Sequence, residues 1–174
     1  MKMVALAVLV ASLAGTVTAH AQTAEEAVAY VFLGVAEGAK IVRGQTTMTW
    51  TETATSPATF AGDVDISGKS YKIGFTVKGI DDCHYEITLD GPPQLVRGGS
   101  ALYARVDLHD VGEVTIAGDA LHVAIKGTGF CETGTKNPTC MVIDTTDLYG
   151  GVDAARHKAA GEFLKSEVCK AATQ

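Results

Sequence analysis

The chain has 174 residues, a formal net charge of −6 and a hydrophobic content of 47%. Its acidic balance, with no cluster of basic residues, argues against nucleic acid and anionic membrane surfaces as partners. The length and composition are typical of a single globular domain that buries a hydrophobic core.

The first 21 residues have the three parts of an export signal. A positive start at Lys2 precedes the apolar run Val4–Ala14, which is shorter than the roughly 20 residues that span a bilayer as a helix. Residues 19–21 form an A-x-A site, so we expect cleavage before Gln22. We therefore predict a signal peptide at residues 1–21 and one domain at residues 22–174. The mature protein is expected to be periplasmic or secreted, with no membrane anchor after cleavage.

A helix is predicted at the start of the mature chain. Thr23 and Glu26 have the spacing of a capping box, in which each side chain bonds the backbone amide of the other. The apolar run 27–33 follows, and Gly34 and Gly38 are suitable end points. Because this helix is apolar almost all round, we expect it to pack into the core and not to lie on a membrane.

From Thr46 to Asp144 the apolar residues recur with the period of two that is typical of β-strands. In the first segment Met48, Trp50 and Glu52 share one face. Further alternating segments lie at 58–64, 71–77, 83–89, 102–108, 114–116, 121–125 and 140–143. The sequence Gly118-Asp119 predicts a hairpin turn. No helical pattern interrupts the series, so the sheet should be mainly antiparallel.

A second helix is predicted from Ala154 to Ala172, with Asp153 near its N-cap. Cys169 falls on the polar side of this helix. A disulfide there requires either that the helix frays before Cys169 or that its last turn is pulled round, and the sequence leaves both open. The fold class is α+β: a curved, mainly antiparallel sheet of about eight short strands, flanked by an N-terminal and a C-terminal helix.

The four cysteines, Cys83, Cys131, Cys140 and Cys169, predict two structural disulfides in an exported chain. Four cysteines allow three pairings. We favour Cys131–Cys140, because the residues between them have a loop composition, and Cys83–Cys169 follows by elimination. A zinc site built from these cysteines would usually show a close C-x-x-C pair, and a thioredoxin-like site needs one; the chain has no such pair.

The densest polar cluster, residues 81–86, contains Asp81, His84 and Glu86. Carboxylates beside a histidine can bind a metal or act as an acid–base pair. Turn chemistry at a strand entrance is the simpler explanation of these residues. The histidines have no local metal-binding spacing. We therefore assign no catalytic, cofactor-binding or metal-binding residue, and no cofactor.

We expect an exported, non-catalytic domain that binds a small apolar ligand or a protein partner. A curved sheet closed by two apolar helices can leave a pocket between its layers. The predicted lining of that pocket is aromatic: Phe32, Tyr71, Phe75, Tyr85 and Phe163.

Two alternatives remain open. The first is a small exported hydrolase or isomerase with a site on the polar face of the sheet, built from His84, Glu86, Arg105 or His122.

The second alternative is a structural or inhibitory protein whose contact surface is the loop between Cys131 and Cys140. A loop closed by a disulfide loses little entropy on docking. Lys136 and Asn137 would lie on that surface.

Overall fold

The computed structural model of the chain describes residues 22–43, 46–66, 68–117, 120–125, 129–131, 138–142, 145–148 and 152–170. The predicted signal peptide at residues 1–21 lies outside this part. The helical elements are α1 (Ala24–Leu33), the 3₁₀ turn η1 (Leu108–Asp110), α2 (Ala154–Phe163) and the π-helical turn η2 (Leu164–Val168). The strands are β1 (Lys40–Arg43), β2 (Thr46–Thr55), β3 (Ala58–Ile66), β4 (Lys69–Gly79), β5 (His84–Asp90), β6 (Ser100–Asp107), β7 (Val111–Ala117), β8 (Ala120–Ile125), β9 (Gly129–Cys131), β10 (Cys140–Val142) and β11 (Thr145–Leu148).

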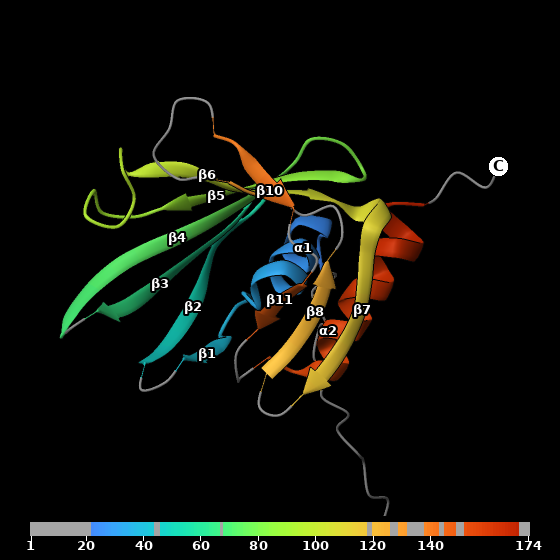
Figure 1. Cartoon of the computed structure of the whole chain (residues 1–174), viewed down its shortest axis with the longest axis horizontal. Helices are drawn as coiled ribbons and strands as arrows, with labels where there is room; N and C mark the ends of the chain where they lie inside the picture. The colour runs from blue at the N-terminus through green and yellow to red at the C-terminus, as the bar shows by residue number, and fades with distance from the viewer. Residues whose placement is uncertain are drawn as a thin grey trace, which may run out of the picture.

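The strands form two antiparallel sheets, which confirms the α+β class. The large sheet has eight strands in the order β1-β2-β3-β4-β5-β6-β9-β10 and is open (Figure 1). The small sheet has three strands in the order β11-β8-β7. The sequence predicted one sheet of about eight strands. The structure differs because the β7–β8 hairpin leaves the large sheet after η1 and pairs with β11, which the sequence did not predict.

The helix α1 begins and ends at the predicted residues. Thr23 is its N-cap, and both hydrogen bonds of the capping box with Glu26 are present. Gly34 ends the helix with φ 70°, a left-handed conformation that glycine adopts without steric penalty. Residues 27–32 are all buried, so the expectation of a core helix is confirmed.

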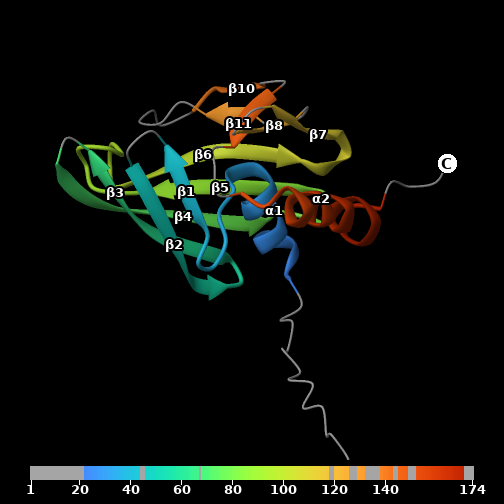
Figure 2. The same ribbon diagram turned by 90° about the horizontal axis from the view of Figure 1, so that it is seen from below.

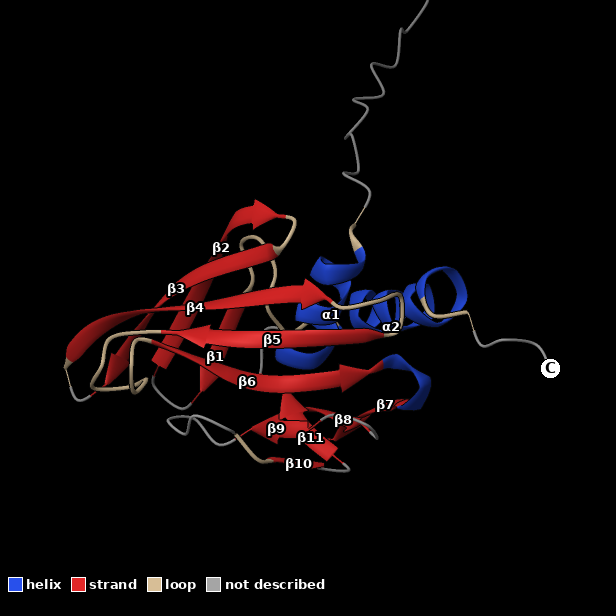
Figure 3. Cartoon of the chain, turned by 90° about the horizontal axis from the view of Figure 1, so that it is seen from above, coloured by secondary structure: helices blue, strands red, loops and turns tan. Residues whose placement is uncertain are grey.

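The first helix packs between the large sheet and the second helix. It contacts β3 and β4 on one side and α2 on the other (Figure 1). Figure 2 shows α1 and α2 side by side. Figure 3 shows β9 and β10 beside β6, with the strands of the small sheet grouped near them. In the described residues, no helix has both the length and the apolar character needed to cross a membrane.

Glu25 ties α1 to the sheet through two backbone amides. Its Oε1 accepts the Gly79 N–H at 2.9 Å, where β4 ends, and its Oε2 accepts the Ala58 N–H at 3.2 Å, where β3 begins. A carboxylate that accepts two amides in this way forms charge-assisted hydrogen bonds. The first turn of α1 is therefore fixed relative to two strands.

A row of aromatic rings crosses the inner face of the large sheet. Trp50 on β2, Phe75 on β4, Tyr103 on β6 and Phe130 on β9 follow one another with ring centres 5.3–5.4 Å apart. Such tilted and edge-on ring contacts stabilise the fold by more than the burial of their apolar area alone. The row links the strands across nearly the whole width of the sheet.

The second helix changes winding before it reaches its disulfide. It is α-helical to Phe163 and continues as a π turn from Leu164 to Val168. A π turn holds about one residue more than an α turn, so the residue that follows is rotated by roughly 100° about the axis. Cys169 is consequently 5% exposed and bonded to Cys83. The structure combines both expectations, because the helix ends before Cys169 and its last turn is rewound.

The contact between the two helices contains a buried histidine that the sequence did not single out. His157 on α2 is 0% exposed, and its Nε2 donates to the Val31 carbonyl of α1 at 2.8 Å. Burial lowers its pKa, in spite of the hydrogen bond to Val31. His157 is therefore a neutral core residue at pH 7.

Candidate functional site

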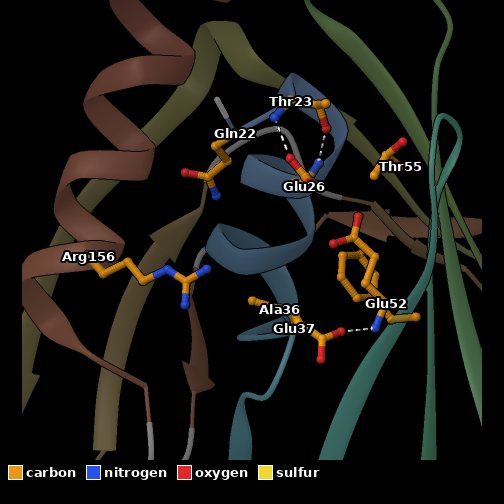
Figure 4. Close-up of a pocket in the computed structure, with 9 residues that line it drawn as sticks. Gln22, Thr23, Glu26, Ala36, Glu37, Glu52, Thr55 and Arg156 are labelled. Carbon is orange, nitrogen blue, oxygen red and sulfur yellow. Dashed lines mark hydrogen bonds between the residues drawn. The ribbon is translucent and has the colours of Figure 1, made fainter. Parts of the chain in front are cut away.

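A pocket of about 690 Å³ lies among α1, β2 and the start of α2. This volume falls within the range of small-molecule sites. The lining residues are Gln22, Thr23, Glu26, Ala36, Glu37, Glu52, Thr55, Phe60 and Arg156. Figure 4 shows Glu26 and Glu37 on α1 and the turn after it, with Glu52 reaching toward them from β2. Three carboxyl groups therefore share one small space, which we call the acidic pocket.

The helix cap positions the first of these carboxyl groups. The Glu26 backbone N–H donates to Thr23 Oγ1 at 3.1 Å, and the Glu26 carboxylate accepts the Thr23 backbone N–H. The capping box thus holds the carboxylate at the N-terminus of α1, where the helix dipole favours negative charge. Glu26 has a structural role and a place in the pocket at the same time.

The second carboxyl group is positioned by the turn between α1 and β1. That turn pairs with β2, because Gly38 donates to the Trp50 carbonyl at 2.9 Å and Trp50 donates to the Ala39 carbonyl at 3.0 Å. The Glu37 carboxylate extends the same ladder by accepting the Glu52 backbone N–H at 2.6 Å. This bond places the Glu37 charge directly beside Glu52.

The third carboxyl group, that of Glu52, has a raised pKa. Glu52 lies on the same face of β2 as Trp50, which is 1% exposed, so its side chain turns toward α1. Within the described residues, Glu52 Oε1 is buried and has no hydrogen-bond partner. Burial first, and then the carboxyl groups of Glu26 and Glu37, raise the pKa of Glu52 to about 7. This group therefore gains and loses its proton near neutral pH.

Arg156 enters the pocket from α2 and is the one basic side chain among its described lining residues. Asp153 caps this helix by accepting the Arg156 backbone N–H at 2.7 Å. The guanidinium carbon lies 4.4 Å from the centre of the Tyr30 ring, and this cation–π contact orients the side chain. The Tyr30 hydroxyl in turn accepts the Asp153 backbone N–H at 3.0 Å, which joins α1 to α2 at this end.

The alternation of residues in the strand carries a signal for Glu52. Because residues two apart share a face of a strand, Glu52 lies with Met48 and Trp50 on the apolar face of its strand. A carboxyl group on an apolar face needs a partner or a raised pKa, and either outcome marks a functional candidate. The sequence pattern marks Glu26 as a capping residue, and no local pattern marks Glu37.

The five aromatic residues predicted to line a pocket are mostly part of the core. Phe32, Phe75 and Tyr85 are 2%, 9% and 4% exposed, and Tyr71 and Phe163 are partly buried. Tyr85 lines a second, smaller pocket of about 350 Å³, which shares Thr23 and Thr55 with the acidic pocket. The other four line neither of these two pockets.

The four residues proposed for a site on the polar sheet face lie in different surroundings. Arg105 Nε is 3.2 Å from Glu86 Oε1 across the β5–β6 ladder, and both side chains are open to solvent. His84 pairs instead with Asp81. His122 belongs to β8 in the small sheet, and its side chain lies outside the described part of the structure. Among the described side chains, Glu86 and Arg105 are therefore paired, whereas His84 bonds a different residue.

Both disulfides have the pairing that the sequence favoured, and no described cysteine is free. Cys131 and Cys140 are direct partners in the β9–β10 ladder, so their bond links adjacent strands. Lys136 and Asn137, the proposed contact residues, lie outside the described residues.

Comparison of the chain with protein-family models, with curated proteins and with solved structures found no match. The function therefore has to be inferred from the chemistry of the pocket.

Proposed function

We propose that this protein is an exported, non-catalytic domain that binds a small organic ligand with a positively charged nitrogen in the acidic pocket. The convergence of Glu26, Glu37 and Glu52 on one space carries this proposal. The two disulfides support export to an oxidising compartment, the periplasm or the exterior. An apolar ligand, as expected from the sequence, fits this lining less well.

Electrostatics favour a cation in this pocket. Three carboxyl groups face one guanidinium among the described side chains, and Glu52 takes up a proton near neutral pH because burial and the neighbouring carboxyl groups disfavour its charged form. A bound ammonium group would supply the missing positive charge directly. Binding should then lower the pKa of Glu52 and release its proton, so ligand uptake and proton release are linked.

The remaining lining limits the shape of the ligand. Phe60, the register partner of Glu52 on β3, is 1% exposed and presents an apolar surface beside the carboxyl groups. Arg156 can hold a carboxylate or carbonyl oxygen of the same ligand. A small amine with a short apolar body therefore fits best, and an acidic group at its far end would add affinity.

A second candidate, acid–base catalysis in the same pocket, is supported by the raised pKa of Glu52. A carboxyl group with a pKa near 7 is suited to move protons at neutral pH. Mass spectrometry of any bound amine after incubation separates the two candidates. An unchanged ligand supports binding alone, and a new product supports catalysis.

Calorimetry with matched pairs of small molecules tests the proposal. n-Butylammonium and the zwitterion γ-aminobutyrate should bind and raise the melting temperature Tm of the purified protein, whereas n-butanol should not. At pH 7 the binding heat should depend on the buffer, because Glu52 releases a proton on binding. Glu52→Gln should weaken amine binding at least tenfold and abolish the buffer dependence.

The control is Glu86→Gln, which removes an exposed carboxylate outside the pocket. It should leave amine binding unchanged. Equal binding of amines and alcohols, or equal binding by the Glu52 and Glu86 variants, would contradict the proposal. So would the absence of binding by every member of a panel of small monoamines, diamines and quaternary ammonium ions.

A further inference from the structure

Three side chains of the metal-ligating type meet at the junction of β5, β6 and η1. His84 begins β5 and Asp107 ends β6, and they are direct partners in the antiparallel register. His109 follows in η1. One donor atom from each of the three lies within 4.8 Å of the other two. Two imidazoles and one carboxylate are a common donor set for transition-metal ions.

Asp81 fixes the orientation of the His84 ring. Its carboxylate oxygens lie 2.8 and 2.9 Å from His84 Nδ1, and Oδ1 also accepts the backbone N–H groups of Cys83 and His84, each at 2.8 Å. Because the carboxylate requires a proton on Nδ1, the neutral imidazole of His84 carries its lone pair on Nε2. Nε2 faces Asp107, with 3.6 Å to Oδ2. Metal-binding histidines are typically oriented by a carboxylate in this way.

The turn after β6 brings His109 to the same carboxylate. The Asp107 Oδ1 atom accepts the His109 backbone N–H at 3.0 Å and lies 2.6 Å from His109 Nδ1. The two imidazole rings have their centres 5.9 Å apart. Asp107 therefore lies between two histidines that come from different elements.

The backbone that carries these residues is held by covalent and hydrogen bonds. Cys83, next to His84, is linked to Cys169 beyond α2. The Cys83 carbonyl accepts the Leu108 N–H at 2.8 Å, which fixes the start of η1 against the start of β5. A rigid backbone reduces the entropy that is lost when an ion gathers its ligands.

We propose that His84, Asp107 and His109 form a binding site for a first-row divalent transition-metal ion such as Zn²⁺, with Asp81 as the residue that positions His84. At metal–ligand distances of about 2.0–2.2 Å, neighbouring ligand atoms of a tetrahedral ion lie about 3.3 Å apart. The separation of 3.6 Å between His84 Nε2 and Asp107 Oδ2 already approaches that value.

The remaining adjustment involves side chains alone. The three side chains are 37–53% exposed and can rotate, and the ion would replace the hydrogen bond between Asp107 and His109. The open side of the site leaves room for water as a fourth ligand. Mg²⁺ and Ca²⁺ prefer sites made of oxygen ligands, so two imidazoles select against them.

Titration of the untagged, purified protein with ZnCl₂ tests the site. Calorimetry should show one ion bound per chain, and saturating Zn²⁺ should raise Tm by several degrees, because the ion crosslinks β5, β6 and η1. MgCl₂ and CaCl₂ at the same concentrations should do neither. Co²⁺ should show the intense visible absorption of a tetrahedral site that contains nitrogen ligands.

Substitutions assign the binding to these residues. His84→Ala and His109→Ala should each weaken Zn²⁺ binding more than tenfold, and Asp81→Asn should weaken it about tenfold, because it loosens the ring of a ligand. Circular dichroism should show native folding in each variant, since all three side chains are half-exposed. Glu86→Gln is the matched control, on the same strand as His84 but outside the cluster, and should bind Zn²⁺ as the parent protein does.

Three results would overturn the proposal. The first is the absence of Zn²⁺ binding below millimolar concentrations. The second is binding that the His84 and His109 variants retain unchanged. The third is equal binding of Mg²⁺ and Zn²⁺, which would indicate nonspecific attraction to an acidic surface.

Discussion

Trp50 lies across Gly62, its register partner in the β2–β3 ladder. A Cβ atom at Gly62 would come within 2.9 Å of Trp50 Cε3, so the indole occupies the space that any other side chain would need. The ring also contacts Phe75, with 5.4 Å between centres. Gly62 is therefore required by packing, and its absent side chain admits the indole to the core.

Gly62→Ala should destabilise the protein by about 1–3 kcal/mol, because the core cannot expand around the indole. The free energy of unfolding in urea measures this loss, and the Trp50 fluorescence should shift as the ring moves. Gly161→Ala is the control, since a Cβ there meets nothing within 4 Å. That change within α2 should stabilise by about 0.5–1 kcal/mol. Equal effects of the two changes would refute the packing argument.

Glu25→Ala should destabilise by about 1–3 kcal/mol, because it leaves the Gly79 and Ala58 amides without their carboxylate. Hydrogen exchange should locate the effect, with faster exchange of these two amides than in the parent protein. Glu162→Ala removes an exposed carboxylate of α2 that pairs only with Lys158 among the described residues. Its effect should stay below about 0.5 kcal/mol. Unchanged exchange at Gly79 would count against the proposed link.

His157 should make the fold sensitive to acid. Its pKa is lowered by burial in the folded state, whereas the unfolded chain takes up the proton near pH 6.5. The unfolded state therefore binds more protons below that pH, and stability should fall as the pH drops from 6.5 toward the folded pKa. Urea unfolding at a series of pH values gives the free energy of unfolding as a function of pH. This free energy should fall less steeply with decreasing pH in His157→Gln than in the parent protein. An identical slope in both proteins would show that this imidazole is not responsible.

Glu52 should make the fold less stable at high pH, the opposite of the effect of His157. Its folded pKa of about 7 lies above the ordinary value of 4.5, so its contribution to stability is complete below about pH 4.5 and is lost as the pH rises through 7. Glu52→Gln should therefore raise Tm relative to the parent protein at pH 8 and change it little at pH 4. Carbon-13 NMR of the Glu52 carboxyl group should show its midpoint near 7. A midpoint near 4.5 would remove the basis of the predicted proton release.

The two disulfides should differ in their contribution to stability. Cys83 and Cys169 are 86 residues apart and Cys131 and Cys140 are 9 apart, so the chain-entropy model assigns about 4–5 kcal/mol to the first bond and about 2–3 to the second. Replacing both cysteines of a bond by serine should lower Tm, and the decrease should be larger for the Cys83–Cys169 bond than for the Cys131–Cys140 bond. Thiol titration of the denatured, unreduced protein should find no free thiol. Two or more thiols per chain would show that a bond fails to form.

Local features of the fold were predictable from the sequence because short-range physics determines them. Thr23, Glu26 and Gly34 fix the ends of α1 through hydrogen bonds and a left-handed backbone, all within a few residues. The alternation of apolar residues similarly identified most of the strands. The separate small sheet was not predictable, since the partner of a hairpin depends on contacts that its own sequence does not specify.

The candidate sites could mostly not be predicted from the sequence, because they depend on which residues of neighbouring strands pair. His84 meets Asp107 only after β5 and β6 pair through the irregularity at Ile87 and Thr88, where the ladder skips Tyr103. No local spacing encodes that offset. Glu52 is the exception, since its place beside Trp50 on the apolar face was visible in the strand pattern.

An open sheet has two edges at which a foreign strand could add, and this one ends in a short strand at each edge. The described edge strands are β1, with four residues, and β10, with three. Short edges offer few unpaired amides and carbonyls to template another chain. At β10 the bond between Cys131 and Cys140 also keeps the edge strand from peeling away and exposing β9. Two of the longest strands, β3 and β4, are paired on both sides, so their backbone is protected by neighbouring strands.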